Sequence, residues 1–192
     1  PLHDRYRMEI DFLPADQVQR LQDMTMVINA FFGWDFNSCE CLRQGDTWHP
    51  IDFANACPDS QVSSLHYHFP WLIKSNLRWS IFCAATDRSV RSNLNWQQYF
   101  DVADQDIPFD EKLDGYIDIA RQHFQVDEFE EFCGTHLAGL DETAHEFFAS
   151  ETVHEAIAEK VAALYPEHEV DEFVELFWNR VQKWRAQEGP GA

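Results

Sequence analysis

The apolar residues in the second half of the chain recur at the spacing of helix faces, and this pattern constrains the fold more than any other feature. From about residue 95 onward every apolar stripe follows the i, i+3, i+4 rule, and Pro108 and Pro166 mark helix boundaries. Such stripes are typical of helices that pack against one another. They are formed by Leu113, Ile117, Ala120 and Phe124; by Val153, Ile157, Val161 and Leu164; and by Val170, Phe173, Val174, Phe177, Val181 and Trp184.

The first half of the chain has a mixed pattern. Apolar residues at helical spacing between residues 15 and 30 predict a helix, and Pro70 leads a second, almost wholly apolar stretch, Trp71 to Ala85, that we expect to be a buried helix. Aromatic and β-favouring residues between them predict strands. We therefore expect an α+β piece over residues 1–97 and an acidic all-helical extension over residues 98–192.

Charge is distributed unevenly along the 192 residues. Residues 101–175 contain 22 of the 34 acidic residues and only three basic ones, Lys112, Arg121 and Lys160. Most of these acids are expected on solvated helix faces, and their field would repel a phosphate backbone, so we expect no binding to nucleic acid. No apolar run approaches the roughly 20 residues of a membrane span, so we expect no membrane partner and a cytoplasmic protein. The five cysteines favour reduced thiols.

A β-hairpin is predicted between residues 31 and 53. The tetrapeptide Arg43-Gln44-Gly45-Asp46 supplies the turn, and the residues on both sides favour strands. With the turn centred on Gly45-Asp46, paired residue numbers sum to about 91, so Asp52 is expected opposite Cys39. Asp35 is then expected opposite residues 55 and 56. The segment Asn55 to Ser64 reads as a shaped loop.

The hairpin brings oxygen-bearing residues toward one place. Side chains alternate along a strand, so Asp35 and Asp52 are expected on the same face, with the amide oxygen of Asn55 turned toward them. Two carboxylates and an amide oxygen suit Mg²⁺, which keeps several waters and bridges nucleotide phosphates. The sequence therefore predicts a hard-cation site at Asp35, Asp52 and Asn55.

This stretch resembles the last two strands of the ATP-grasp fold. The chain has Gly33-Trp34-Asp35-Phe36, then a turn at Gly45, Ile51-Asp52, and Asn55-Ala56-Cys57-Pro58, preceded by a helix. In outline the family has G-x-D-F, a turn with glycine, an apolar residue with E-x-N, and a proline. The resemblance covers residues 15 to 72. The amino-acid sequence after the turn is also similar to that of bacterial ATP-grasp proteins of unassigned substrate. The resemblance implies that Asp35, Asp52 and Asn55 hold the magnesium ions on ATP.

The chain departs from the family pattern at three positions. Asp52 replaces the usual glutamate, Asp52 and Asn55 are three residues apart where the family has two, and Asp59 stands where many members have glycine. A bulge at Phe53-Ala54 would restore the facing of positions 52 and 55.

Acceptor-binding residues are expected after the loop. In the peptide-ligase members, hydroxyl and basic groups in this region bind the carboxylate of the acceptor. The matching candidates for substrate binding here are Ser60, Ser63, Ser64, His66, His68, Lys74 and Arg78. Structural roles compete: the histidines suit internal hydrogen bonds, and Lys74 and Arg78, one turn apart, suit pairing with acids.

The resemblance implies a carboxylate–amine ligase that uses ATP with Mg²⁺, or Mn²⁺, to form an acyl phosphate that an amine attacks. Its nucleotide-clamping lysines, glycine-rich loop and acyl-substrate domain would precede Pro1, so we expect upstream sequence and little turnover from this chain alone. The implied partners are a nucleotide and a small-molecule or peptide substrate, and self-association stays open.

Two other interpretations of the function stay open, a zinc-stabilised module and a non-catalytic interaction module. Cys39, Cys41 and Cys57 with His66 and His68 are metal-ligand residue types that would suit a zinc site. The acidic helices alone suit a module that recruits a basic partner without catalysis.

Overall fold

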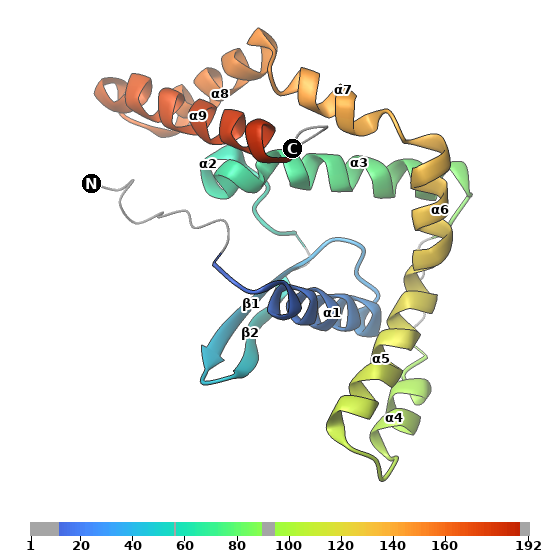
Figure 1. The fold of residues 1–192 in the computed structure, drawn as a ribbon. Coiled ribbons are helices and arrows are strands. Elements are labelled where there is room, and N and C mark those ends of the chain that lie inside the picture. The colour runs from blue at the N-terminus through green and yellow to red at the C-terminus, as the bar shows by residue number, and fades with distance from the viewer. Residues whose placement is uncertain (1–11, 56, 90–94, 189–192) are drawn as a thin grey trace. The chain divides into compact units, whose positions relative to one another are not determined.

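The computed structural model describes residues 12–55, 57–89 and 95–188 (Figure 1). The described residues are mostly helical and carry a two-stranded antiparallel sheet, in agreement with the expected α+β class. The chain divides into two compact units, and each combines two separate stretches: 1–58 with 91–126 in the first unit, and 59–90 with 127–192 in the second. No described helix is both long enough and apolar enough to cross a membrane.

The first unit begins with helix α1, Ala15–Phe32, which follows Pro14 as predicted. The helix ends because Gly33 adopts a left-handed conformation, with φ of 68°. The amide of Gly33 donates to the carbonyl of Ala30, and the amide of Trp34 donates to that of Asn29. These two bonds satisfy carbonyls that the last turn leaves open, which is the usual role of a glycine at this position.

The hairpin of the first unit is formed by β1, Ser38–Gln44, and β2, Thr47–Asn55, beside α1 (Figure 1). Gly45, at φ of 61°, provides the positive φ that a two-residue hairpin turn requires. Near the turn the predicted register is confirmed, with Gln44 paired to Thr47 and Cys41 to Pro50. Farther from the turn the pairing shifts at two irregularities, so that Glu40 pairs with Asp52 and Ser38 with Asn55.

Helices α4, Gln97–Ala103, and α5, Phe109–Phe124, complete the first unit. Aromatic rings attach α4 to α1: Trp96 stacks on Phe31 with centroids 5.6 Å apart, and Tyr99 meets the same ring edge-on at 5.1 Å. The indole of Trp96 also donates to the carbonyl oxygen of Phe31, at 2.9 Å. Such contacts combine apolar burial with a satisfied polar group and so fix the position of α4 against α1.

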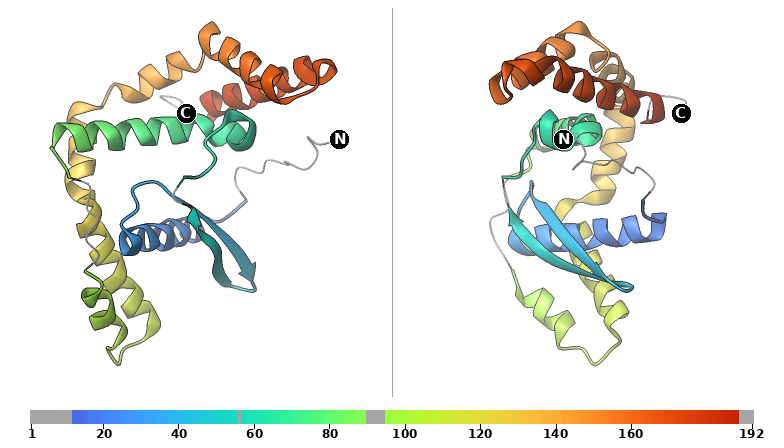
Figure 2. Two further views of the ribbon diagram at one scale, coloured as in Figure 1. Left: turned by 180° about the vertical axis from the view of Figure 1, so that it is seen from behind. Right: turned by 90° about the vertical axis from the view of Figure 1, so that its left-hand side faces the viewer.

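The second unit is wholly helical in its described residues. It comprises α2 (Val62–Leu65), the 3₁₀ turn η2 (His66–His68), α3 (Phe69–Ala85), α6 (Val126–His136, which begins one residue before this unit), α7 (Leu140–Phe147), α8 (Glu151–Leu164), η3 (Glu167–Glu169) and α9 (Val170–Glu188). Helices α8 and α9 lie side by side, and α9 also contacts η2 (Figure 2).

The core of the second unit confirms most of the predicted stripes of α8 and α9, although Leu164 is 53% exposed. Val153, Ile157 and Val161 of α8 are buried, as are Phe173, Phe177, Val181 and Trp184 of α9. Phe82 of α3 is also buried and contacts the rings of Trp79, Phe129 and Phe132.

Three expectations need correction. The compact units differ from the expected division at residues 97 and 98, because α4 and α5 pack with α1 through contacts that local patterns do not reveal. Helix α3 buries Pro70 and Phe82 but leaves Trp71 54% exposed, so only part of its surface lies in a core. Residues 62–64, expected in a loop, lie in α2, and the Asp59 carboxylate accepts bonds from the amide of Gln61 and the hydroxyl of Ser64.

Candidate functional site

Asp35 lies in the bend between α1 and β1, and not in a strand as expected. Its side chain is exposed. The bend is held by Asn37, whose amide nitrogen donates to the side-chain oxygen of Asn29 in α1 at 2.9 Å and to the carbonyl oxygen of Phe53 in β2 at 3.0 Å. Asn37, which the sequence did not single out, thus attaches the segment that carries Asp35 to the end of β2.

Asp52 is exposed in β2, and its cross-strand partner is Glu40. The expected partner, Cys39, was wrong by one residue. Between the pairs Ser38–Asn55 and Glu40–Asp52, β1 has one residue and β2 has two, Phe53 and Ala54. The predicted bulge at Phe53-Ala54 is therefore confirmed. Because of the bulge, Asp52 and Asn55, three residues apart in β2, pair with Glu40 and Ser38, which are only two residues apart in β1. In two regular strands these separations would be equal.

Two carboxylates face one another across the hairpin. Glu40 and Asp52 are directly opposed carboxylates, and like charges in this arrangement destabilise a hairpin unless a cation lies between them. Among the described residues no three His, Cys, Asp or Glu side chains converge on one point. Binding of a hard cation by this hairpin therefore stays a prediction, which would need a cation that takes few protein ligands and keeps its waters.

The three candidate serines have different surroundings. The hydroxyl of Ser64 donates to the Asp59 carboxylate, whose other oxygen accepts the amide of Gln61 at 3.0 Å. The carbonyl oxygen of Ser63 lies 2.7 Å from Nε2 of His66. Ser60 lines a pocket in the second unit. Asp59 therefore organises this turn, and a role of the serines in substrate binding stays a prediction.

The two candidate histidines do not share a face, because residues 66–68 form a 3₁₀ turn and not a strand. His66 is buried, its ring lies 5.1 Å from that of Phe177, and its φ is 49°. Burial lowers the pKa of His66, Arg180 adds to this, and the Ser63 carbonyl opposes it. His68 is exposed, and its ring lies edge-on to Tyr67. The internal hydrogen bond of His66 is the structural role that competed with substrate contact.

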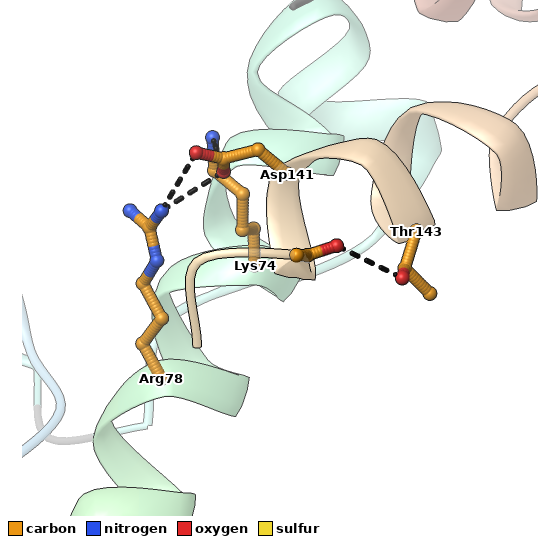
Figure 3. A network of polar contacts seen from close by, with 5 residues as sticks. Lys74, Arg78, Asp141 and Thr143 are labelled. Atoms are coloured by element: carbon orange, nitrogen blue, oxygen red, sulfur yellow. Dashed lines mark hydrogen bonds and ion pairs between the residues drawn. The ribbon is translucent and has the colours of Figure 1, made fainter. Parts of the chain in front are cut away.

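Lys74 and Arg78 of α3 meet Asp141 of α7 (Figure 3). The ammonium of Lys74 lies 2.9 Å from Oδ1 of Asp141, and one guanidinium nitrogen of Arg78 lies 2.9 and 3.0 Å from the two carboxylate oxygens. Lys74 also lies over the ring of Trp184, 5.7 Å from its centroid. The pairing with an acid that the sequence allowed is thus present, and its partner is a residue of the same chain.

This charge cluster is partly screened from solvent, since the side chain of Lys74 is 15% exposed and that of Asp141 48%. Burial alone would raise the pKa of Asp141, but the bonds and charges of Lys74 and Arg78 outweigh it and hold that pKa below its usual value. Nε of Arg78 is buried without a hydrogen-bond partner among the described residues. Contact of Lys74 or Arg78 with a substrate stays a prediction.

The zinc reading finds no support in the described part of the chain, where no such group of ligands converges. Sγ of Cys39 and Sγ of Cys41 are 3.9 Å apart. Burial, together with Cys41, raises the pKa of the Cys39 thiol to about 11, so this thiol is protonated near neutral pH.

Comparison with known proteins identifies no family for this chain. No family model matches this chain, and neither the curated proteins nor the solved structures include a match.

Proposed function

We propose that this chain supplies the magnesium-binding hairpin of an ATP-grasp-type carboxylate–amine ligase. The observation that carries the proposal is the bulged register of β2, which opposes Asp52 to Glu40 and compensates for the extra residue between Asp52 and Asn55. The family pattern has its two ligands two residues apart, so a chain with three needs such a bulge. The sequence was compatible with a bulge but did not require one.

The surroundings of the hairpin support the same role. Asp52 is exposed, so a nucleotide with its metal can approach, and its neighbour across the ladder is a carboxylate and not a cation. The bend with Asp35 is bonded through Asn37 to the carbonyl of Phe53, one residue beyond Asp52. The bend and β2 would thus supply the oxygen ligands from two short segments of one unit.

The proposed chemistry assigns limited tasks to this chain. Magnesium would neutralise charge on the phosphoryl group that passes from ATP to a carboxylate substrate. Asp35, Asp52 and Asn55 would hold the metal, and no side chain of the hairpin is required as a covalent nucleophile. Selection of the carboxylate and of the amine belongs to other surfaces.

The test measures ATP-dependent phosphate release by the full-length protein. We expect Asp52→Ala to lower the rate by at least about a hundredfold, because a ligand of the catalytic metal is lost. Asp46→Ala is the matched control: it removes another exposed carboxylate, from the turn of the same hairpin, and should leave the rate unchanged. Equal rates for Asp52→Ala and the unsubstituted protein would refute the proposal.

A further inference from the structure

The second unit contains a mostly apolar pocket of about 340 Å³. Lys74, Arg78 and Asp141 are not among the residues that line it. Its wall is formed by α8 together with the first turns of α3, the end of α7 and the residues around the start of α2. Val62, Phe148, Val153 and Ile157 are buried residues of this wall, and Phe147, half exposed, also lines the pocket.

Lys160 of α8 is the one charged residue among the described residues that line the pocket, and the others are apolar except Ser60, Gln61 and Thr152. Lys160 makes no ion pair with any residue that the structure describes, although 22 of the 34 acids lie within residues 101–175. Its helix explains this. The positions three and four residues away, where an acid would reach it, are Ala156, Ile157, Ala163 and Leu164.

The polar and apolar features lie along one line of α8. Thr152, Val153, Ala156, Ile157 and Lys160 all line the pocket, so the lining follows one face of the helix and ends at Lys160. From Thr152 to Lys160 the helix advances about 12 Å, about the length of an extended ten-carbon chain.

From this arrangement we infer that the pocket binds a small amphiphilic carboxylate, with its apolar body on the α8 wall and its carboxylate at Lys160. A neutral apolar molecule would leave the lysine unused, and a small anion would leave the apolar wall unused. A pocket with mostly apolar walls and a single placed charge is the usual form of a site for such a ligand. The inference concerns the second unit and does not depend on the proposed role of the hairpin.

The test is isothermal titration calorimetry of the full chain with sodium decanoate. We expect saturable binding of one decanoate, no detectable binding of acetate, and weaker binding of decyltrimethylammonium despite the net charge of −20. A chain that bound the cationic amphiphile as well as decanoate would contradict a site organised by Lys160.

Variants locate the site. Lys160→Gln should raise the Kd for decanoate about tenfold, because a charge-assisted contact is lost. Lys183→Gln, an exposed lysine of α9 outside the pocket, is the matched control and should leave the Kd unchanged. Ala156→Phe should abolish binding by filling the pocket, with the circular dichroism spectrum as a check on folding. No binding of decanoate, or equal binding by Lys160→Gln and Lys183→Gln, would overturn the inference.

Discussion

Asp141 of the second unit and Asp52 of the first unit have different electrostatic surroundings. In the second unit Asp141 is surrounded by two cations, Lys74 and Arg78, and its pKa is held low. In the first unit Asp52 is exposed, and the residue that faces it across the hairpin is another acid, Glu40. Both sites were candidates from sequence, and both contain charged residues near apolar elements.

The difference separates structural charges from charges that require an added partner. A carboxylate that already has its cations gains little from a ligand, and its removal leaves those cations unpaired. Two opposed carboxylates repel one another, and they gain from a divalent cation. Removal of Asp141 should therefore affect stability, whereas removal of Asp52 should affect metal binding.

Asp141→Ala should give the largest change in stability, a loss of about 2 kcal/mol in the free energy of unfolding, because Lys74 and Arg78 would stay partly buried without their acid. Urea denaturation at neutral pH measures it. Glu142→Ala is the matched control, since it removes an exposed acid from the same first turn of α7. Equal losses in the two variants would mean that helix-end charge, and not the ion pairs, matters.

The dependence of stability on pH in the acid range gives a second check of the Lys74–Arg78–Asp141 cluster. The pKa of Asp141 is lower in the folded chain than its usual value of 3.8, so the ion pairs contribute fully above that value. Their contribution is lost as the pH falls from 3.8 through the folded pKa. The unsubstituted chain should lose more stability over that range than Asp141→Ala does.

His66 should make the second unit less stable in weak acid. Its pKa in the folded chain lies below the usual 6.5, mainly because it is buried, so the unfolded chain binds the proton more readily. Stability should therefore fall as the pH drops below about 7, with a slope of at most about 1.4 kcal/mol per pH unit. Urea midpoints between pH 8 and pH 5 should change less in His66→Gln. An identical slope in both proteins would contradict this assignment.

Glu40→Gln should produce the smallest effect, a gain of about 0.5 kcal/mol in the absence of divalent cations, because repulsion across the hairpin is relieved. Adding Mg²⁺ should stabilise the unsubstituted chain more than this variant. A loss of stability without metal would show that Glu40 has a favourable partner and would break the contrast with Asp141.

Local features of the fold could be predicted from the sequence. The Gly45 turn, α1, and the buried stripes of α8 and α9 follow from turn chemistry and helical periodicity, which act over a few residues. The composition of the units could not be predicted in this way. The stacking of Trp96 on Phe31 brings together residues far apart in sequence, and neither residue carries a local sign of its partner.

The candidate site shows the same limit. The bulge at Phe53-Ala54 followed from the spacing of Asp52 and Asn55, but a second irregularity nearer the turn replaced Cys39 with Glu40 opposite Asp52. Lys74 and Arg78 were recognised as charges in an apolar helix. Their partner could not be selected from 34 acids, because Asp141 is 63 residues beyond Arg78 and becomes distinctive only when α3 and α7 pack together.

Binding of Mn²⁺ to the 192-residue chain, followed by the electron paramagnetic resonance of free Mn²⁺, tests most directly whether the hairpin holds a cation. We predict weak binding that Asp52→Asn reduces by at least about tenfold and that Asp46→Asn leaves unchanged. Equal binding by Asp52→Asn and Asp46→Asn would contradict the account.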